Sequence, residues 1–308
     1  MKLVYFDDYR LGVLKSDRVV DVTATVADVP YVDREDIVNR LIVRFDSYRA
    51  RLEKVAVAAE GIALSSVKLR PPVPRPSSIF CMAVNYLDGM FPPKEIDAFQ
   101  KAPTTLIGPG DTMVLPDIPA SIFEGEAELA VVIGAPAEAV SEADALKHVF
   151  GYMNFIDGSA RDLPGRTNPF FQMKSRKTFA PIGPYLVTAD EVTDPQNLNV
   201  KLWINGTLKQ DYSTRDMNHK IARCISWLSG MQPLLPGDII ACGTHHAGLS
   251  AFMDDDVVEM EIAPLGKLVI GVRDDLRRTW SRETRADRKG MTPITTPQLT
   301  GKYAEQGK

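Results

Sequence analysis

The sequence predicts an α+β protein that is mostly β, with a small N-terminal α/β domain ahead of a larger β core. Short apolar segments that alternate in the manner of strands recur over residues 78–273, and turn signals such as Asn205-Gly206 separate them. Between residues 37 and 59, apolar side chains instead recur at three- and four-residue spacing, which favours helix. Four prolines fall within residues 70–78, where their missing N–H donors exclude a helix or a central strand. The chain therefore divides into an α/β start, a break and a β-rich remainder.

Four regions follow from this order: residues 1–70 (a small N-terminal domain), 71–77 (a Pro-rich linker), 78–273 (the core domain) and 274–308 (a C-terminal extension). In the first region, strand-type alternation covers residues 3–22, and the helical stretch ends before Gly61. The extension is too polar to build a core of its own. We expect it to dock, including at a dimer contact, with Trp280 and Tyr303 as anchors.

Two helices are expected inside the core domain. Ser141 and Asp144 indicate a capped start for a helix that continues to His148. A second helix is expected over residues 214–229, because Met217 and later apolar residues share one helical face. The strand candidates are residues 79–84, 104–107, 112–115, 126–133, 152–156, 184–188, 198–204, 238–242, 257–262 and 268–272.

The composition is that of an ordinary globular protein. The chain has 308 residues, 44% of them apolar, which is enough to bury a substantial core. Its net charge of −4 argues against nucleic acid as a partner, because such binding needs a basic surface. Asp7 and Asp8 argue against a signal peptide, and no apolar run reaches the roughly 18 residues of a membrane span. Three cysteines without a CxxC pair indicate free thiols and a cytoplasmic location.

The sharpest local feature is an acidic stretch, residues 123–128, that runs into an apolar one. Side chains two positions apart share a face of a strand, so Glu124 and Glu126, with Glu128 as a third candidate, are expected to point the same way. Like charges at the entry to a buried segment repel each other, and a divalent cation would compensate them. The alternative is an exposed edge strand whose carboxylates are solvated.

Three further features each allow a chemical and a plain structural interpretation. Asp157-Gly158 indicates a turn that ends a strand, or a capped helix start. The cationic residues 174–177 would hold a substrate carboxylate or form an exposed charged run. His245-His246 follows a strand end, where site residues often gather, although solvent-facing turn histidines are the alternative. Zinc is disfavoured because no Cys or His partner is suitably spaced, and the nucleotide-binding and GxSxG motifs are absent.

Taken in order, these segments match a known family. Over about residues 78–273 the chain resembles the fumarylacetoacetate hydrolase family, with a family-type N-terminal domain ahead of it. The number and order of the matching blocks make the resemblance specific. The blocks are Cys81-x-x-x-Asn85-Tyr86, Lys101-Ala102-Pro103, Ile107-Gly108-Pro109-Gly110-Asp111, residues 124–134, Gly151-Tyr152 to Asp157, Ser159-Ala160-Arg161-Asp162, Lys174-Ser175, residues 180–184, Asn205-Gly206-x-x-x-Gln210, residues 235–240 and Gly243-Thr244.

The resemblance implies a mixed, rolled β-sheet core flanked by short helices, usually in a homodimer, and an enzyme that acts on 2-oxo acids or 1,3-dicarbonyl acids. It also implies one Mg²⁺ or Mn²⁺ ion, held by the carboxylates that match the family's ligands, which are Glu124, Glu126 and Asp157. Lys174 matches a lysine that lines this pocket, and we expect it to be catalytic. The residues expected to contact the substrate are Tyr86, Arg161, Gln172 and Thr244, the last of them at the substrate's carboxylate.

The chain departs from the family pattern at the group that activates water. Hydrolytic members usually carry a His-Glu pair on a short lid helix after the Asn-Tyr motif, and here Gly89 stands at the histidine position. Pro92-Pro93 also disfavours a helix at this point. A hydrolase would need another base, for which the candidates are His245, His246, Asp88, Lys94 and Glu95. We favour a histidine of the tandem pair, because an unperturbed imidazole titrates near neutral pH.

The leading hypothesis is a divalent-metal-dependent hydrolase that cleaves a C–C bond in a 2,4-dioxo acid or acylpyruvate, in the catabolism of aromatic or related compounds. The alternative is a lyase or isomerase, such as a decarboxylase or tautomerase, that works through a metal-stabilised enolate and needs no activated water. A binding protein on a former enzyme fold is the third possibility, and the clustered carboxylates argue against it. The lid segment and residues 163–172 are expected to shape the substrate pocket.

Overall fold

The computed structural model describes residues 1–163 and 169–304, and strands predominate among them as expected. The α-helices are α1 (Ile37–Ile42), α2 (Phe45–Ala58), α3 (Glu142–Ala145), α4 (Pro169–Lys174) and α5 (Ile221–Met231). The strands are β1 (Lys2–Phe6), β2 (Arg10–Lys15), β3 (Arg18–Asp21), β4 (Ile62–Ala63), β5 (Leu69–Arg70), β6 (Ile79–Met82), β7 (Ala98–Lys101), β8 (Leu106–Ile107), β9 (Thr112–Val114), β10 (Phe123–Ile133), β11 (Val149–Ala160), β12 (Ala180–Thr188), β13 (Asn199–Ile204), β14 (Thr207–Ser213), β15 (Ile239–Ala241), β16 (Val257–Ile262), β17 (Gly266–Arg273), β18 (Thr279–Trp280) and β19 (Gln298–Thr300).

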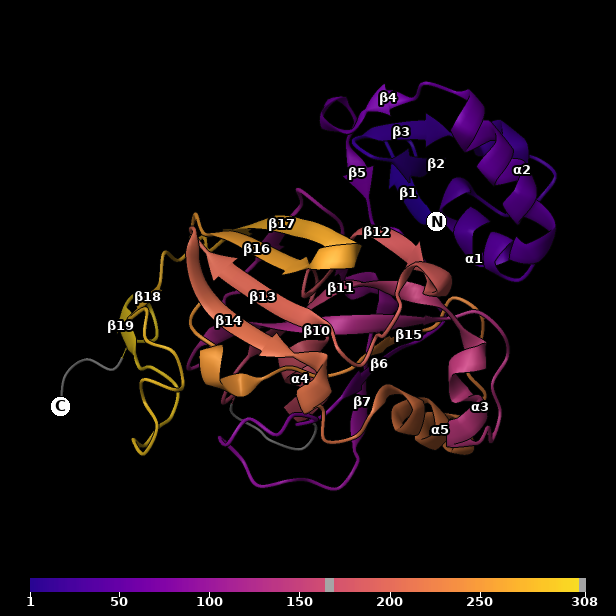
Figure 1. The fold of residues 1–308 in the computed structure, drawn as a ribbon. Helices are drawn as coiled ribbons and strands as arrows, with labels where there is room; N and C mark the ends of the chain where they lie inside the picture. The colour runs from indigo at the N-terminus through magenta and orange to yellow at the C-terminus, as the bar shows by residue number, and fades with distance from the viewer. Residues whose placement is uncertain (164–168, 305–308) are drawn as a thin grey trace.

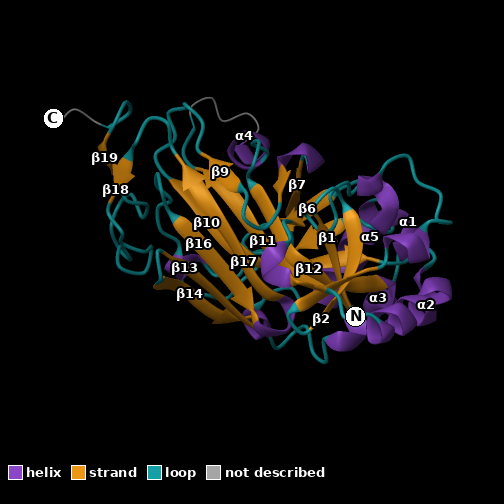
Figure 2. Cartoon of the chain, turned by 90° about the horizontal axis from the view of Figure 1, so that it is seen from above, coloured by secondary structure: helices purple, strands orange, loops and turns teal. Residues whose placement is uncertain are grey.

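One large mixed sheet runs through both the N-terminal region and the core. Its main path is β4-β3-β2-β1-β12-β11-β10-β15-β6-β7, and β1 joins the core by antiparallel pairing of Leu3 with Leu186 of β12. Residues 1–70 therefore share a sheet with the core rather than forming a sheet of their own. The N-terminal helices α1 and α2 lie at the same end of the molecule as α3 and α5 (Figure 2). Buried Leu41 of α1 belongs to the same apolar cluster as Val132 and Met153 of the core strands.

A second sheet covers the other face of these core strands. It has the order β14-β13-β16-β17-β9 and lies across β10 and β11 in Figure 1. Its inward side chains, such as Leu202 and Met260, pack in one apolar cluster with Leu129 and Ile156. As a result β10 is covered on both faces, and all its residues are buried. The polar side chains at the start of β10 are therefore buried in closely packed surroundings.

The strand pair β10–β11 is longer than the sequence indicated. Asp157-Gly158 does not form a turn or a helix start, because it pairs within the strand against Gly125 and Glu126. Gly158 fits there because a Cβ atom would meet Phe179 at 2.9 Å. A helix over residues 214–229 was also expected, and α5 begins only at Ile221. The cap at Ser141 is confirmed, since its side chain accepts the Asp144 N–H.

The lid segment, residues 87–97, contains no helix, as Pro92-Pro93 predicted. It is tied to the core at its far end, where the Lys94 carbonyl accepts from Asn218 Nδ2 at 2.8 Å and lies 2.9 Å from His219 Nε2. Part of the expected pocket segment, residues 164–168, lies outside the described residues.

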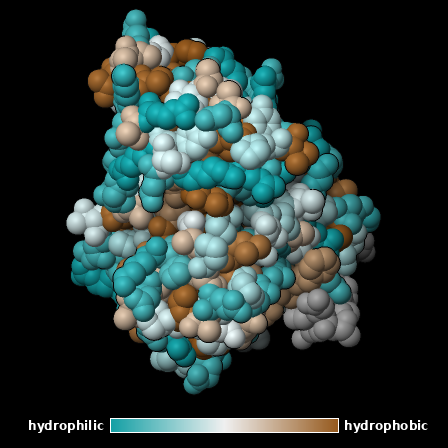
Figure 3. Space-filling model, turned by 90° about the vertical axis from the view of Figure 1, so that its right-hand side faces the viewer, coloured by the Kyte–Doolittle hydropathy of each residue, from teal (hydrophilic) through white to brown (hydrophobic). Residues whose placement is uncertain are grey.

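The C-terminal extension docks on its own chain through both expected anchors. Trp280 Nε1 donates to the Ser121 carbonyl at 2.7 Å, and the Tyr303 hydroxyl donates to Asp117 at 2.6 Å. On the face seen in Figure 3, hydrophobic side chains lie in small patches among hydrophilic ones, which is ordinary for a solvated surface. None of the described helices is long and apolar enough to span a membrane.

Candidate active site

Three buried carboxylates meet on the strand pair β10–β11. Glu126 and Glu128 lie two positions apart on β10, and Asp157 lies opposite Glu126 on β11, so the three share one face of the sheet. Each offers an oxygen within 4.8 Å of the oxygens of the other two, and all three residues are buried. We call Glu126, Glu128 and Asp157 the acidic triad.

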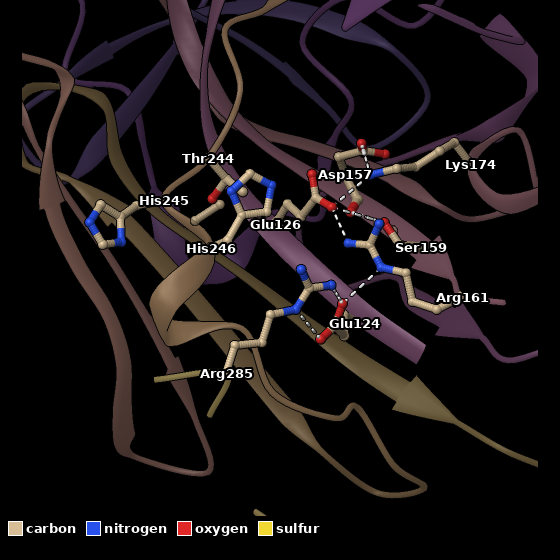
Figure 4. Close-up of polar contacts among 12 residues, drawn as sticks. Glu124, Glu126, Asp157, Ser159, Arg161, Lys174, Thr244, His245, His246 and Arg285 are labelled. Atoms are coloured by element: carbon tan, nitrogen blue, oxygen red, sulfur yellow. Dashed lines mark hydrogen bonds and ion pairs between the residues drawn. The ribbon is translucent and has the colours of Figure 1, made fainter. Parts of the chain in front are cut away.

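Two buried lysines compensate part of this negative charge. Lys174, the last residue of α4, donates from Nζ to Glu126 Oε1 at 2.7 Å and to Asp157 Oδ2 at 2.6 Å (Figure 4). Lys101, the last residue of β7, donates to Asp157 Oδ1 at 2.5 Å and to the Gly158 carbonyl at 3.3 Å. Buried charges of this kind persist only when they are paired. Lys174 was expected near the site, whereas Lys101 lies in a matching block for which no role was expected.

The carboxylates of the triad differ in their tendency to ionise. Burial opposes ionisation of Glu126, but Lys174 and Arg161 hold the pKa of Glu126 well below its usual range. Burial and the charges of Asp157 and Glu126 raise the pKa of Glu128 well above its usual value. Among the described residues Glu128 has no cationic hydrogen-bond partner, and its Oε2 accepts the Gly243 N–H at 2.7 Å. A divalent cation would supply the missing positive charge, and three carboxylates are ligands that suit Mg²⁺ or Mn²⁺.

Glu124 lies outside the triad, whereas the expected ligand set was Glu124, Glu126 and Asp157. Arg161 donates from Nε to Glu124 Oε2 at 2.8 Å, and Arg285 donates to both Glu124 oxygens, at 3.1 and 2.5 Å. Despite burial, the two guanidinium groups hold the pKa of Glu124 below its usual value. Strand alternation placed the three glutamates on one face but could not distinguish between them. The choice depends on Arg285, which comes from the C-terminal extension and has no local sequence signal.

His246 and Asp88 form a hydrogen-bonded pair beside the triad. His246 begins the short 3-10 helix η8 (His246–Gly248), and its Nδ1 lies 3.0 Å from Asp88 Oδ2. The His246 backbone N–H donates to the same oxygen at 2.8 Å. Burial opposes ionisation of Asp88, but these hydrogen bonds hold its pKa well below the usual range. Phe91 packs edge-on against the His246 imidazole. Figure 4 shows the His246 ring beside Thr244 and Glu126.

His245 points away from the triad (Figure 4). Its ring stacks on Tyr212, with the ring centroids 5.6 Å apart and the planes at 23°. Burial lowers the pKa of His245. Of the two histidines that the sequence could not separate, only His246 faces the acidic cluster.

The residues expected to contact substrate are placed differently from one another. Thr244 is buried, and its hydroxyl accepts from Gln210 Nε2 at 2.8 Å. Tyr86 is buried too, and its hydroxyl has no hydrogen-bond partner among the described residues. Arg161 reaches the site through Glu124, as above, and also donates to Glu126. Gln172 lies on α4 and is partly exposed. Gln210 was part of a matching block but was not expected at the site.

Comparisons with known proteins agree with this geometry. The family model described as "Fumarylacetoacetate (FAA) hydrolase C-terminal" matches residues 78–273. The oxaloacetate tautomerase YisK of Bacillus subtilis (strain 168) is 38% identical over 220 residues, which are 67% of this chain and 73% of that protein. The 4-hydroxyphenylacetate degradation bifunctional isomerase/decarboxylase of Salmonella dublin is 40% identical over 224 residues. That match covers 71% of this chain but 52% of the relative, so the chain spans about half of its length.

Among solved structures, the maleylpyruvate hydrolase of Sphingobium sp. SYK-6 is similar over a larger part of the chain. Its complex with manganese(II) and pyruvate has a TM-score of 0.80 and 35% sequence identity, covering 89% of this chain and 99% of that one. The manganese in that structure agrees with the donor set of the acidic triad, which fits Mg²⁺ or Mn²⁺. The matched span, the relatives and the buried carboxylates lead to one conclusion: the chain belongs to the fumarylacetoacetate hydrolase family of enzymes.

Proposed function

We propose that this protein is a divalent-metal-dependent hydrolase that cleaves a C–C bond in a 2,4-dioxo acid of the acylpyruvate type, in the catabolism of aromatic or related compounds. The observation that carries the proposal is the Asp88–His246 pair. It offers a general base near the acidic triad, although Gly89 stands where hydrolytic members usually have histidine. The likeness to a maleylpyruvate hydrolase along 89% of the chain supports the same reaction class.

Glu126, Glu128 and Asp157 are the residues that would hold Mg²⁺ or Mn²⁺. The bound ion supplies Lewis acidity, polarising the substrate's 2-oxo group and stabilising an enolate. Lys174 and Lys101 offset the charge of two of the three carboxylates, because they donate to Glu126 and Asp157. The same lysines place positive charge near the position where negative charge develops during C–C cleavage.

Asp88 fixes the protonation pattern of the His246 ring. An ionised carboxylate only accepts hydrogen bonds, so the Nδ1 beside Asp88 carries the ring proton and Nε2 is free to accept one. In the proposed reaction Nε2 takes a proton from water while the water oxygen adds to the carbonyl carbon remote from the 2-oxo acid. The C–C bond then breaks, its electron pair passes to the pyruvate enolate, and the enolate is protonated to pyruvate. The other product is a carboxylic acid, and Thr244 is expected to bind the carboxylate of the 2-oxo acid end.

The test is a single-turnover reaction of an acylpyruvate with the Mn²⁺-loaded protein in H₂¹⁸O. Hydrolysis places one ¹⁸O atom in the released acid, and mass spectrometry of that acid measures it. Conversion without ¹⁸O in the acid would reject hydrolysis while leaving metal binding untouched.

A tautomerase or decarboxylase is the second candidate, and the sequence relatives favour it. YisK is named an oxaloacetate tautomerase, and the Salmonella dublin relative is an isomerase/decarboxylase. The triad and its lysines would stabilise an enolate without any activated water, so Gly89 would be no obstacle. Enol–keto conversion of oxaloacetate, followed by ultraviolet absorbance, and CO₂ release would identify these activities. If either exceeds acylpyruvate cleavage in rate, the second candidate replaces the first.

We also propose that the protein is a cytoplasmic homodimer. The family resemblance supports the dimer, and the free, buried cysteines Cys81, Cys224 and Cys242 support a reducing compartment. Sedimentation velocity at micromolar concentration tests the dimer. A single species at the mass of one 34.0 kDa chain would contradict it.

A further inference from the structure

The C-terminal extension lies outside the family-model match, which ends at Arg273, yet it reaches the active site. Its Arg285 is buried and holds both oxygens of Glu124, the glutamate two positions before Glu126 of the acidic triad (Figure 4). Nothing in the proposed reaction assigns a role to this arginine. The question is what a buried cation from outside the family domain does at the edge of a metal site.

The extension is fixed first to the segment that leads into β10. Arg278 is fully buried and donates to Asp274 and to the carbonyls of Pro116 and Ile118, at 2.9 and 3.1 Å for the carbonyls. Trp280 is 3% exposed and donates to the Ser121 carbonyl. These contacts fasten the extension three to eight residues before Glu124, so its position is set relative to the acidic strand.

The extension is fixed a second time to the segment that contains η8. The backbone N–H of Arg285 donates to the Leu249 carbonyl at 2.9 Å, and that of Ala286 donates to the Ala247 carbonyl at 2.8 Å. Arg282 pairs with Asp256 at 2.7 and 2.6 Å. Arg285 is therefore held from both sides, by the start of β10 and by the helix that begins with His246.

A chain of alternating charges connects Arg285 to the acidic triad. Arg285 and Arg161 both donate to Glu124, and Arg161 also donates to Glu126. Arg161 is thus shared between two carboxylates, and Arg285 supplies the second positive charge at Glu124. A buried charge acts on its surroundings over several ångströms, because little water screens it.

We propose that Arg285 is a positioning residue through which the C-terminal extension sets the charge of the active site. Its positive charge opposes binding of the divalent cation and favours binding of the anionic 2-oxo acid. The two effects have opposite signs because the two ligands have opposite charges. The anionic substrate class rests on the proposed function, whereas the effect on the cation rests on the geometry alone.

The experiment is a two-step calorimetric titration of the full-length protein, first with Mn²⁺ and then, at saturating Mn²⁺, with oxalate as a dianionic probe. For Arg285→Gln we expect Mn²⁺ to bind roughly three- to tenfold more tightly and oxalate roughly three- to tenfold more weakly than for the wild type. Arg285→Lys keeps the charge and should stay within about twofold of the wild type for both ligands. Glu124→Gln removes the opposite charge and should shift both affinities in the reverse direction, which provides the test if Arg285→Gln fails to fold.

Arg282→Gln is the matched control, because Arg282 lies on the same extension and pairs with a buried carboxylate, Asp256, away from the triad. It should lower the midpoint temperature of thermal unfolding. It should not shift the affinities for Mn²⁺ and oxalate in opposite directions. If Arg285→Gln weakens both ligands, as loosening of the extension would, or changes neither, the proposal is overturned. Neither titration requires turnover, so a failure of the proposed hydrolysis would leave this result standing, and a negative result here would leave hydrolysis open.

Discussion

The acidic triad and the Asp88–His246 pair lie close together but are built in different ways. The triad stands on β10 and β11, two long strands that pair in the centre of the molecule and are covered on both faces. Asp88 and His246 stand on a lid segment and on the turn after β15, and they meet across 158 positions of sequence. A rigid strand pair can hold mutually repelling carboxylates in place. A group carried by a loop can be replaced from another loop without changing the sheet, which would allow the proposed base at His246 although the lid carries Gly89.

Loss of a carboxylate from the strand-held region should have the largest effect. Glu126→Gln and Glu128→Gln each remove one negative ligand from the triad and should weaken Mn²⁺ binding at least about 100-fold and abolish turnover. The fold should remain, because the neutral amide keeps the shape of the side chain. Calorimetry measures the affinity and circular dichroism the fold.

Glu124→Gln is the control for the proposed ligand set of Glu126, Glu128 and Asp157, since Glu124 has the same chemistry but is held by arginines. It should change Mn²⁺ affinity by about tenfold or less. If Glu124→Gln lowers Mn²⁺ affinity as much as Glu128→Gln does, Glu124 would again be assigned as a metal ligand.

The same contrast explains how much of the site could be predicted from the sequence. The alternation of residues 123–128 correctly predicted that the glutamates share a face, because a strand's period is fixed by its backbone geometry. The family resemblance correctly predicted Asp157 and Lys174 near Glu126. The choice of Glu128 over Glu124 could not be predicted, because it depends on where Arg285 docks after folding. The same limit applied to Asp157-Gly158, where pairing with β10 overrides the local turn preference.

The loop-held region was predictable only as a set of candidates. Both members of the Asp88–His246 pair were among the possible bases, but no local pattern links residues so far apart. The choice between His245 and His246 depends on side-chain direction, since neighbouring residues at the end of a strand face opposite ways. Here the His245 ring stacks on Tyr212, and the His246 ring forms a hydrogen bond with Asp88.

His246→Ala tests the loop-held region by removing the proposed base alone. We expect kcat for acylpyruvate cleavage to fall about 10²- to 10³-fold, the usual loss for a general base, while Mn²⁺ affinity changes little because no ligand is removed. His245→Ala is the matched control from the adjacent position, and it should lower kcat less than about threefold. Steady-state kinetics at saturating Mn²⁺ distinguishes the two. If kcat falls equally in both variants, His246 is not the general base.

Asp88→Asn should have the smallest effect, on stability and its dependence on pH. In the folded protein, hydrogen bonds from His246 lower the pKa of Asp88 against the opposing effect of burial, and in the unfolded chain that pKa is near 4. A carboxyl group whose pKa is lowered by folding stabilises the folded state fully above its unfolded pKa. That contribution is lost as the pH falls through the folded pKa. The wild type should therefore exceed Asp88→Asn in free energy of unfolding by about 1–2 kcal/mol at pH 7, which is the scale of a hydrogen bond to a charged group.

The difference should shrink between pH 5 and pH 3.5, where the unfolded chain takes up the proton. Urea denaturation of the metal-free protein at pH 7, 5 and 3.5 measures it. Asp275→Asn is the control, because Asp275 is 74% exposed and pairs only at the surface with Arg273, so its replacement should change stability by less than about 0.5 kcal/mol at each pH. A difference for Asp88→Asn that grows between pH 5 and pH 3.5 would mean that the Asp88–His246 hydrogen bonds do not favour the ionised carboxylate. His246 would then lack the partner that leaves its Nε2 free to act as a base.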